Sequence, residues 1–261
     1  MIKISVVIPT YKRPDYLERL LKSIGNNIEF INDVVIVDDC SPNIKEYKAM
    51  LQDFQDKFNI TFIHNSENRG APYCRNLGIS LAKEEYIALT DDDDEWCDGK
   101  VEAQIQKISD NVGLIYTWAR SINDKNEIKD EYCLTKEGNI VEELLKKNMI
   151  PSSSVIVNKQ AVEKVGGFDV RQPSCQDWDM WLRIAKAGYD VACVEDFLLI
   201  YHKASRDSIG KSQGAKKGYY RFYRKHFRLF VQYFFISNNF RKYIKIGIMR
   251  RLHAALNNNG K

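Results

Sequence analysis

Segments typical of strands and of helices alternate through the first hundred residues, and this order constrains the fold more than any other feature of the chain. Segments typical of buried strands, rich in apolar and β-branched residues, lie at 3–10, 33–43, 59–65 and 85–92, and the second runs into a turn. Segments with helical periodicity or helix-end signals lie between them, at 13–25, 44–58 and 68–83. Repeated strand–helix–strand units connect parallel strands by crossovers. We therefore predict an α/β, Rossmann-like fold with a mostly parallel central sheet and flanking helices.

The second half of the chain is less regular. Helical patterns lie at 101–109, 141–147, 159–165 and 175–188. Strand-like runs lie at 151–158 and 190–202, and the sequence GGFD at 166–169 is typical of a turn. Residues 115–140 show no pattern that predicts their structure. We divide the chain into a main domain at 1–207 and a C-terminal region at 208–261.

Charge is distributed unevenly along this chain, whose formal net charge is +4. Residues 208–261 hold 13 of the 39 Lys and Arg residues and none of the 35 Asp and Glu residues. The rest of the chain is therefore acidic, with 26 basic against 35 acidic residues. This asymmetry predicts a separate role for a basic, aromatic-rich, helical C-terminal tail.

The six cysteines are scattered and form no C-x-x-C pair, which argues against zinc ribbons and disulfide-dense scaffolds. The sequence opens on a strand-like run instead of a signal peptide. No apolar run reaches the ~18–20 residues that a membrane-spanning helix needs. We therefore expect a protein of the reducing cytosol.

Carboxylates follow two of the predicted strands, at Asp38–Asp39 and at Asp91–Asp94. Because parallel strands end at the same edge of a sheet, both groups should lie at the edge where ligands bind. Like charges this close repel one another, so a fold tolerates them only where water solvates them or a cation binds them. A solvated acidic turn is the ordinary interpretation of such a run. Their shared edge instead favours a hard divalent cation, Mg²⁺ or Mn²⁺, which also binds substrate phosphates.

Six segments follow one another between residues 2 and 208: SVVIPTYKRPDYLERLLKSI, VVIVDDCSPN, NRGAPYCRNLGI, YIALTDDDDEW, VGGFD and QDWDMWLR. Each alone is a weak signal, but the six in this order are specific. Together they resemble the inverting family 2 glycosyltransferases, which have the GT-A fold of nucleotide-diphospho-sugar transferases. The resemblance implies a nucleotide-sugar-binding half at 1–100 and an acceptor-binding, catalytic half at 101–207.

The resemblance also implies roles for donor-side residues. Asp91, Asp92 and Asp93 match the family's D-x-D motif, with Asp93 as the direct metal ligand and Asp91 beside it, nearer the ribose. Asp39 matches the carboxylate that reads the nucleobase, which suits a uracil N–H. Arg75 is similar to the family's diphosphate-side arginine, and its alternative is an ordinary surface arginine. The predicted nucleotide-sugar-binding residues are Pro9, Thr10, Tyr11, Arg13, Asp38, Asp39, Asn68, Arg75, Asp91, Asp92 and Asp93.

Inverting transfer needs one base, which takes the proton of the acceptor hydroxyl as its oxygen attacks C1 of the sugar. The family's base lies in an E-D-[WY] motif, and the matching residues here are Gln176, Asp177 and Trp178. The resemblance therefore implies Asp177 as the base, with Gln176 in place of the family's Glu. Asp179 is the rival, but it points about 200° round the helix from Asp177.

Further residues are assigned to the acceptor and to the diphosphate. The resemblance places four on the acceptor side: Gly167, Phe168, Gln176 and Trp178. Trp178 and Trp181 have a second interpretation as core residues, because aromatics at helical spacing more often pack inside. YHKASR at 201–206 departs from the family's late Y-R-x-H pattern. The candidate diphosphate contacts there are His202, Lys203 and Arg206.

The tail has three interpretations. Its mixture of cations and aromatics suits a helix lying on an anionic membrane. Nucleic-acid binding and packing of the aromatics on the main domain are the alternatives. The acidic remainder makes nucleic acid the weakest, so we predict no nucleic-acid partner. A membrane-lying tail fits a lipid-linked acceptor and a place on the cytoplasmic face of a bacterial plasma membrane.

We predict a metal-dependent inverting glycosyltransferase that moves a hexosyl or N-acetylhexosaminyl group from a UDP-linked donor to a saccharide hydroxyl. The implied acceptor is a polyprenyl-diphosphate-linked oligosaccharide in surface polysaccharide assembly, such as O-antigen or capsule. A sugar-1-phosphate nucleotidyltransferase is the enzymatic alternative, but IPTYKRPDYL lacks its Gly-rich phosphate loop. A nucleotide-sugar-binding homologue without turnover is the other alternative, and it would not need Asp177. The oligomeric state stays open.

Overall fold

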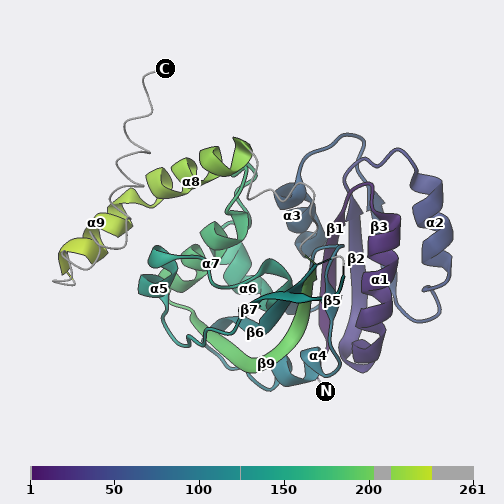
Figure 1. Cartoon of the computed structure of the whole chain (residues 1–261), viewed down its shortest axis with the longest axis horizontal. Coiled ribbons are helices and arrows are strands. Elements are labelled where there is room, and N and C mark those ends of the chain that lie inside the picture. Colours follow the sequence, from purple (N-terminus) through teal and green to yellow (C-terminus); the bar gives the residue numbers. More distant parts are fainter. Residues whose placement is uncertain (1, 124, 203–212, 237–261) are drawn as a thin grey trace.

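The computed structural model describes residues 2–123, 125–202 and 213–236 (Figure 1). The strands are β1 (Ile4–Thr10), β2 (Ile31–Asp38), β3 (Ile60–His64), β4 (Tyr86–Leu89), β5 (Glu95–Trp96), β6 (Val112–Ile122), β7 (Ile128–Tyr132), β8 (Val155–Asn158) and β9 (Asp190–His202). The α-helices are α1 (Pro14–Ile24), α2 (Ile44–Gln52), α3 (Ala71–Leu81), α4 (Lys100–Ile105), α5 (Val141–Lys146), α6 (Lys159–Lys164), α7 (Gln176–Lys186), α8 (Gln213–Lys225) and α9 (Phe227–Ile236). Two short 3-10 helices are η1 (Gly25–Phe30) and η2 (Ser152–Ser154).

These strands form one sheet in the order β3-β2-β1-β4-β8-β6-β9-β5, with β7 paired to β6. The first four strands in this order are parallel, as the sequence predicts. Because β1 lies between β2 and β4, the strand order reverses there. In an open sheet, ligands bind outside the carboxyl ends of the strands at such a reversal. Thr10, Asp38 and His64 lie side by side at those ends, so the predicted edge is confirmed.

Helix α1 covers one face of the parallel strands. Pro14 occupies its first turn, where the missing N–H leaves no hydrogen bond unmade. The predicted apolar stripe is fully buried and consists of Leu17, Leu20, Leu21 and Ile24. It packs in the same core cluster as Val6 of β1, whereas Val7 belongs to the core on the other face, as alternation along a strand requires.

Helix α3 covers the opposite face and approaches β1 closely. The chain enters it through Gly70, whose φ of +84° is unfavourable for residues with a Cβ. A Cβ built on Gly78 would lie 2.4 Å from Cγ1 of Val7, so a glycine is needed where the helix crosses the strand. This contact sets the distance between the strand ends and the start of α3, where donor-side residues are predicted.

The second half of the chain extends the sheet and makes it mixed. β8 is antiparallel to both β4 and β6, and β9 runs parallel to β6. The sequence patterns predict neither β6 nor β7. The predicted strand at 151–158 starts only at Val155, because Ser152–Ser154 form a 3-10 turn. The predicted helix at 101–109 is shorter, since α4 ends at Ile105.

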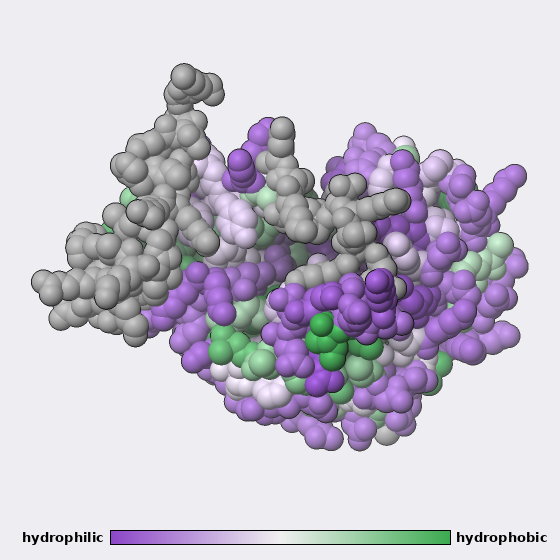
Figure 2. All heavy atoms as spheres, in the orientation of Figure 1, coloured by the Kyte–Doolittle hydropathy of each residue, from purple (hydrophilic) through white to green (hydrophobic). Residues whose placement is uncertain are grey.

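Helices α8 and α9 pack against the second half of the chain, next to α7 and α5 (Figure 1). Phe222 stacks on Trp178 with ring centroids 4.1 Å apart, and Leu229 and Phe230 join the same core cluster. This confirms the packing interpretation for the described part of the tail. None of the helices within 2–123, 125–202 and 213–236 is long and apolar enough to span a membrane. Hydrophilic residues dominate the face shown in Figure 2.

Candidate active site

The two aspartates after β2 are held by the loops around them. The side chain of Asp38 is fully buried, with Oδ2 2.6 Å from Nδ1 of His64. Asp39 accepts hydrogen bonds from the backbone N–H groups of Arg69, over 2.8 Å, and Gly70, over 2.7 Å. Asp38 therefore stabilises the strand end, whereas Asp39 is attached to the segment that begins α3.

Three other predicted donor residues border the same edge. Nδ2 of Asn68 donates to the backbone oxygen of Asp39 over 3.1 Å. Pro9 is buried at the end of β1, and Tyr11 follows the strand with 38% of its surface exposed. The edge thus combines a buried polar frame with one accessible aromatic ring.

The aspartate run lies after β4 and receives hydrogen bonds from the β1–α1 segment. Oγ1 of Thr10 donates to Asp92 over 2.7 Å, and Nη1 of Arg13 donates to Asp93 over 2.7 Å. Burial, together with the charge of Asp93, raises the pKa of Asp92 to about 7. Burial and the charge of Asp91 also raise the pKa of Asp93. The run is therefore short of positive charge even with Arg13 in contact.

The shortage of positive charge around the aspartate run is clearest at Asp94. It is 1% exposed, and neither of its carboxylate oxygens makes a hydrogen bond of ordinary geometry with the described residues. Burial and the charges of Asp93 and Asp91 raise its pKa well above the usual range, and the nearby Ser153 hydroxyl and His202 backbone offset this only in part. A turn solvated by water would not have this burial, so that interpretation of the run is wrong.

The carboxylates also fit a shared divalent cation. Among the described residues, no group of three or more His, Cys, Asp or Glu side chains is placed to hold a metal ion alone. Mg²⁺ and Mn²⁺ need only one or two protein carboxylates when substrate phosphates supply other ligands. The side chains of Asp91 and Asp93 are 31% and 29% exposed, so both remain accessible at the edge. Asp94 is buried beside them, and both of its carboxylate oxygens are without a hydrogen-bond partner among the described residues.

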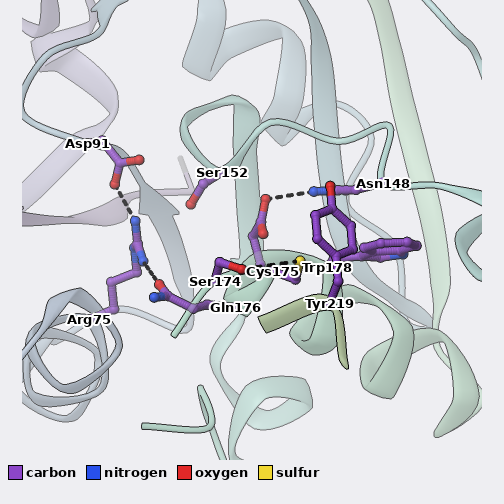
Figure 3. Close-up of a pocket in the computed structure, with 10 residues that line it drawn as sticks. Arg75, Asp91, Asn148, Ser152, Ser174, Cys175, Gln176, Trp178 and Tyr219 are labelled. Atoms are coloured by element: carbon purple, nitrogen blue, oxygen red, sulfur yellow. Dashed lines mark hydrogen bonds and ion pairs between the residues drawn. The ribbon is translucent and has the colours of Figure 1, made fainter. Parts of the chain in front are cut away.

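Arg75 connects the aspartate run to helix α7. Its Nη2 pairs with Asp91, and its Nη1 donates to Oε1 of Gln176 over 3.1 Å (Figure 3). The side chain is only 8% exposed, and the guanidinium lies 5.5 Å from the ring centroid of Phe168. Burial disfavours its charge, but Asp91 and Asp177 keep the pKa of Arg75 raised. The surface-arginine alternative is therefore wrong.

A cavity of about 260 Å³ opens beside this pair (Figure 3). Its lining residues are Arg75, Asp91, Asn148, Ser152, Ser174, Cys175, Gln176, Asp177, Trp178 and Tyr219. Oδ2 of Asp177 accepts a hydrogen bond from Nδ2 of Asn148 over 2.8 Å. Burial raises the pKa of Asp177, while Asn148 and Arg75 act in the opposite direction. The predicted base and the predicted diphosphate arginine thus face one cavity.

Asp179 faces away from this cavity. It is fully buried and accepts hydrogen bonds from Nε of Arg183, over 2.8 Å, and Nζ of Lys225, over 2.9 Å. Nε2 of His226 lies 2.8 Å from its other oxygen. Asp179 therefore joins α7 to the end of α8 and to His226, the residue between α8 and α9, and it is not placed to act as the rival base.

The two tryptophans of α7 are both buried. Nε1 of Trp178 donates to the backbone oxygen of Leu144 over 2.5 Å, and Nε1 of Trp181 donates to that of Ile150 over 3.3 Å. Trp181 is a core residue, which confirms the second of its two predicted interpretations. Trp178 also packs in the core, and because it lines the cavity as well, its acceptor-side role stays a prediction.

The turn at Gly167 and Phe168 lies under the site. With φ at +68°, Gly167 has the left-handed conformation, and a Cβ there would lie 2.7 Å from Oδ1 of Asn76. Asn76 also accepts a hydrogen bond from the backbone N–H of Phe168 over 2.8 Å. The close approach at Gly167 is thus to Asn76, and Phe168 contacts the site through Arg75.

The candidate diphosphate contacts near 201–206 are placed only in part. Nε2 of His202 lies 2.6 Å from Oε1 of Glu95, so β5 and β9 are joined there. The predictions for Lys203 and Arg206 lie outside the described residues.

Sequence analysis does not predict five of the cavity residues, namely Asn148, Ser152, Ser174, Cys175 and Tyr219. Four of them lie in turns or loops. Such segments have no hydrophobic period, so the sequence does not indicate which of their residues contact a distant segment. Cys175 has a φ of +59°, which is uncommon for a residue with a side chain and recurs at functional sites. Only the aromatic content of the tail pointed toward Tyr219.

The mixed sheet, with an acidic edge at the strand reversal and an adjoining cavity, is the arrangement expected for a GT-A fold, and solved structures share it. The chain matches the family model for "Glycosyl transferase family 2" over residues 5–166. This protein belongs to that family. Membership rules against the nucleotidyltransferase alternative.

Two relatives carry names from polysaccharide biosynthesis. One is the putative colanic acid biosynthesis glycosyl transferase WcaA of Escherichia coli (strain K12), which is 29% identical and aligns over 85% of this chain and 81% of its own. Another is the putative teichuronic acid biosynthesis glycosyltransferase TuaG of Bacillus subtilis (strain 168), 24% identical over 88% of this chain and 94% of its own.

Solved structures share the fold at lower identity. S. aureus TarS 1–349 in complex with UDP-GlcNAc has a TM-score of 0.69 and 15% identity, over 85% of this chain and 65% of that one. The mannosyltransferase PcManGT from Pyrobaculum calidifontis in complex with GDP-Man and Mn²⁺ has a TM-score of 0.67 and 17% identity, over 87% of this chain and 64% of that one. This chain therefore spans just under two thirds of both.

Proposed function

We propose that this protein is a metal-dependent inverting glycosyltransferase that moves a UDP-linked hexose or N-acetylhexosamine to a saccharide hydroxyl. The observation that carries the proposal is the shared cavity. Asp177 faces the same space as the Arg75–Asp91 pair, so a base adjoins the region assigned to the donor diphosphate. Asn148 and Gln176 hold the two groups in place from their other sides.

The chemistry follows from this arrangement. Asp177 accepts the proton of the acceptor hydroxyl while that oxygen bonds to C1 of the donor sugar and the bond from C1 to the diphosphate oxygen breaks. Attack from the side opposite the leaving group inverts the configuration at C1. The raised pKa of Asp177 makes it a stronger base than an ordinary aspartate. Asp91 and Asp93 would hold Mg²⁺ or Mn²⁺, which would supply positive charge for the diphosphate when bound.

The nucleotide is proposed to lie at the edge formed by Pro9, Thr10, Tyr11 and Asp39. Related structures contain either UDP-GlcNAc or GDP-Man, so the likeness in fold leaves the base open. We favour UDP because a carboxylate such as that of Asp39 is suited to accept the N–H of uracil.

The acceptor is proposed to be a polyprenyl-diphosphate-linked oligosaccharide in O-antigen or capsule assembly, at the cytoplasmic face of a bacterial plasma membrane. Relatives named for colanic acid and teichuronic acid biosynthesis support a saccharide acceptor. Helices α8 and α9 present five exposed cations; Lys225 pairs with Asp179, and the other four are Lys216, Lys217, Arg224 and Arg228. Each cation near an anionic surface contributes about 1 kcal/mol to binding.

Calorimetric titration of UDP, first with Mn²⁺ and then with EDTA, tests the donor site. We expect binding that needs the metal and that is lost in Asp93→Asn. Asp98→Asn is the matched control, since Asp98 is an exposed carboxylate outside the predicted edge. Equal UDP affinity in EDTA would refute metal dependence, and tighter binding of GDP than UDP would refute the donor assignment.

Sedimentation with vesicles tests the membrane proposal. We expect the full chain to bind phosphatidylglycerol vesicles and to ignore phosphatidylcholine vesicles. The test variant replaces four tail cations by glutamine: Lys216, Lys217, Arg224 and Arg228. A charge-matched control replaces four exposed lysines of the main domain: Lys45, Lys48, Lys57 and Lys83. Equal binding by both variants would contradict a membrane-binding tail.

A further inference from the structure

Tyr219 lines the catalytic cavity although it lies beyond the part of the chain that matches the family. The match ends at residue 166, whereas Tyr219 belongs to α8 in the basic tail. In Figure 3 its ring stands beside Asn148 and Trp178. Its exposed fraction is 43%, so part of the ring is accessible to a ligand. The tail therefore contributes to the site as well as to the core.

Helix α8 is held tightly against the segment that carries the cavity rim. A Cβ on Gly218 would lie 2.8 Å from the backbone nitrogen of Ser174 and even closer to its side chain, so only glycine permits this approach. Nε2 of Gln172 donates to the backbone oxygen of Gly218 over 2.8 Å. Oγ of Ser174 donates to the backbone oxygen of Ala215 over 3.2 Å. These contacts fix the position of α8 at Gly218, which is the residue next to Tyr219.

Trp178 fixes the orientation of the Tyr219 ring. The two rings meet edge to face, with centroids 6.1 Å apart and planes 77° apart. Phe222, one turn further along α8, stacks on Trp178 at 4.1 Å. Such aromatic pairs contribute beyond their buried area and restrict ring rotation. One turn of α8 therefore supplies Phe222 as an anchor and Tyr219 as a wall of the cavity.

The two sides of the cavity differ in chemistry. Figure 3 shows Arg75 and Asp91 on one side, and Asn148 and Tyr219 on the other. An ion pair suits the diphosphate side. An aromatic ring beside hydrogen-bonding groups suits a pyranose, whose C–H face packs on the ring while its hydroxyls bind the polar groups.

We propose that α8 forms the acceptor-side wall of the cavity and that Tyr219 is a specificity-determining platform for the sugar ring of the acceptor. The inference rests on the proposed function, because it takes the Arg75–Asp91 side as the donor side. Tyr219 positions the acceptor sugar so that one hydroxyl faces Asp177. The tail thereby joins acceptor recognition to the catalytic domain.

The test compares the full-length wild type with Tyr219→Ala and Tyr219→Phe. Phe227→Ala is the matched control, because Phe227 is also 43% exposed, on α9, and does not line the cavity. Circular dichroism checks that all four fold alike. UDP binding with Mn²⁺ is measured by calorimetry. A panel of p-nitrophenyl hexosides and N-acetylhexosaminides is then titrated, with UDP and Mn²⁺ present, by saturation-transfer NMR.

We expect equal UDP affinity in all four proteins. The glycoside that binds the wild type should bind about tenfold more weakly to Tyr219→Ala and within about twofold to Tyr219→Phe, since the ring provides the contact. Phe227→Ala should match the wild type. Undiminished glycoside binding by Tyr219→Ala would overturn the inference, as would a wild type that binds UDP but no glycoside. A wild type that binds no UDP would refute the proposed function itself.

Discussion

Nδ2 of Asn148 donates a hydrogen bond to Oδ2 of Asp177 over 2.8 Å, and this contact orients the carboxylate toward the cavity. The two residues are 29 positions apart and come from different segments, the loop after α5 and the start of α7. The proposed base is therefore positioned by a residue that no motif predicts.

Asp177→Asn tests the base directly. The substitution keeps the size of the side chain but removes its ability to take a proton, so we expect kcat to fall by about 10²- to 10⁴-fold. UDP affinity with Mn²⁺ should stay the same, because Asp177 is not assigned to the nucleotide. Turnover of a UDP-sugar, followed by UDP release, measures the first effect and calorimetry the second. Retained turnover would assign the base elsewhere.

Gln176→Glu restores the family's acidic residue and should change the pH dependence of transfer. A second carboxylate beside Asp177 raises the pKa of that residue, because like charges disfavour ionisation. Since the base acts only when deprotonated, the acidic limb of kcat/KM against pH should move to higher pH. Pairing of the new Glu with Arg75 should limit the size of this shift.

The control for this shift is Gln106→Glu, which adds the same charge at an exposed position on the α4 end. It should leave the acidic limb where the wild type has it. A limb that stays in place in Gln176→Glu, or moves to lower pH, would contradict Asp177 as the titrating base.

Lys100 makes the stability of the fold depend on pH. It is fully buried, donates to Oε1 of Gln104 over 2.7 Å, and lies 4.2 Å from the ring centroid of Trp96. Burial lowers its pKa to about 7 from 10.5 in the unfolded chain. Between these values the unfolded state binds more protons, so the free energy of unfolding should rise with pH, at most by about 1.4 kcal/mol per unit.

Lys100→Met should remove that dependence and raise the free energy of unfolding at pH 7. Replacing a buried charge by an apolar group of similar volume gains about 1–4 kcal/mol, less the cost of leaving Oε1 of Gln104 without this donor. Urea unfolding at pH 7 and pH 9 measures both effects. If the free energies of unfolding of the variant and the wild type differed by the same amount at both pH values, the pH dependence would not come from Lys100.

Gly78→Ala should destabilise the junction of α3 and β1. The added methyl would lie 2.4 Å from Cγ1 of Val7, inside a packed core, and overpacking of this kind costs about 1–3 kcal/mol. Gly25→Ala is the control, because Gly25 has helical angles and no atom within 4 Å of its Cβ position. It should be neutral or stabilising. Equal melting temperatures for the two variants would contradict the close packing.

The sequence determined by itself the parallel half of the sheet, the acidic edge and the side of α7 that carries Asp177. Strand and helix periods are local, and strands joined by crossovers must end together, so residues such as Asp39 and Asp91 can be placed without coordinates. The apolar stripe of α1 is predicted for the same reason.

Only the tertiary structure decided which side chains complete the cavity and what the tail does. Asn148, Ser174 and Tyr219 meet Asp177 through contacts between distant segments, and such contacts have no period in the sequence. Likewise, burial distinguishes Asp94 from a solvated aspartate, and the exposed fraction of a side chain depends on everything packed around it. The sequence shows that the tail is basic and aromatic, but only its packing on Trp178 shows that part of it lines the candidate active site.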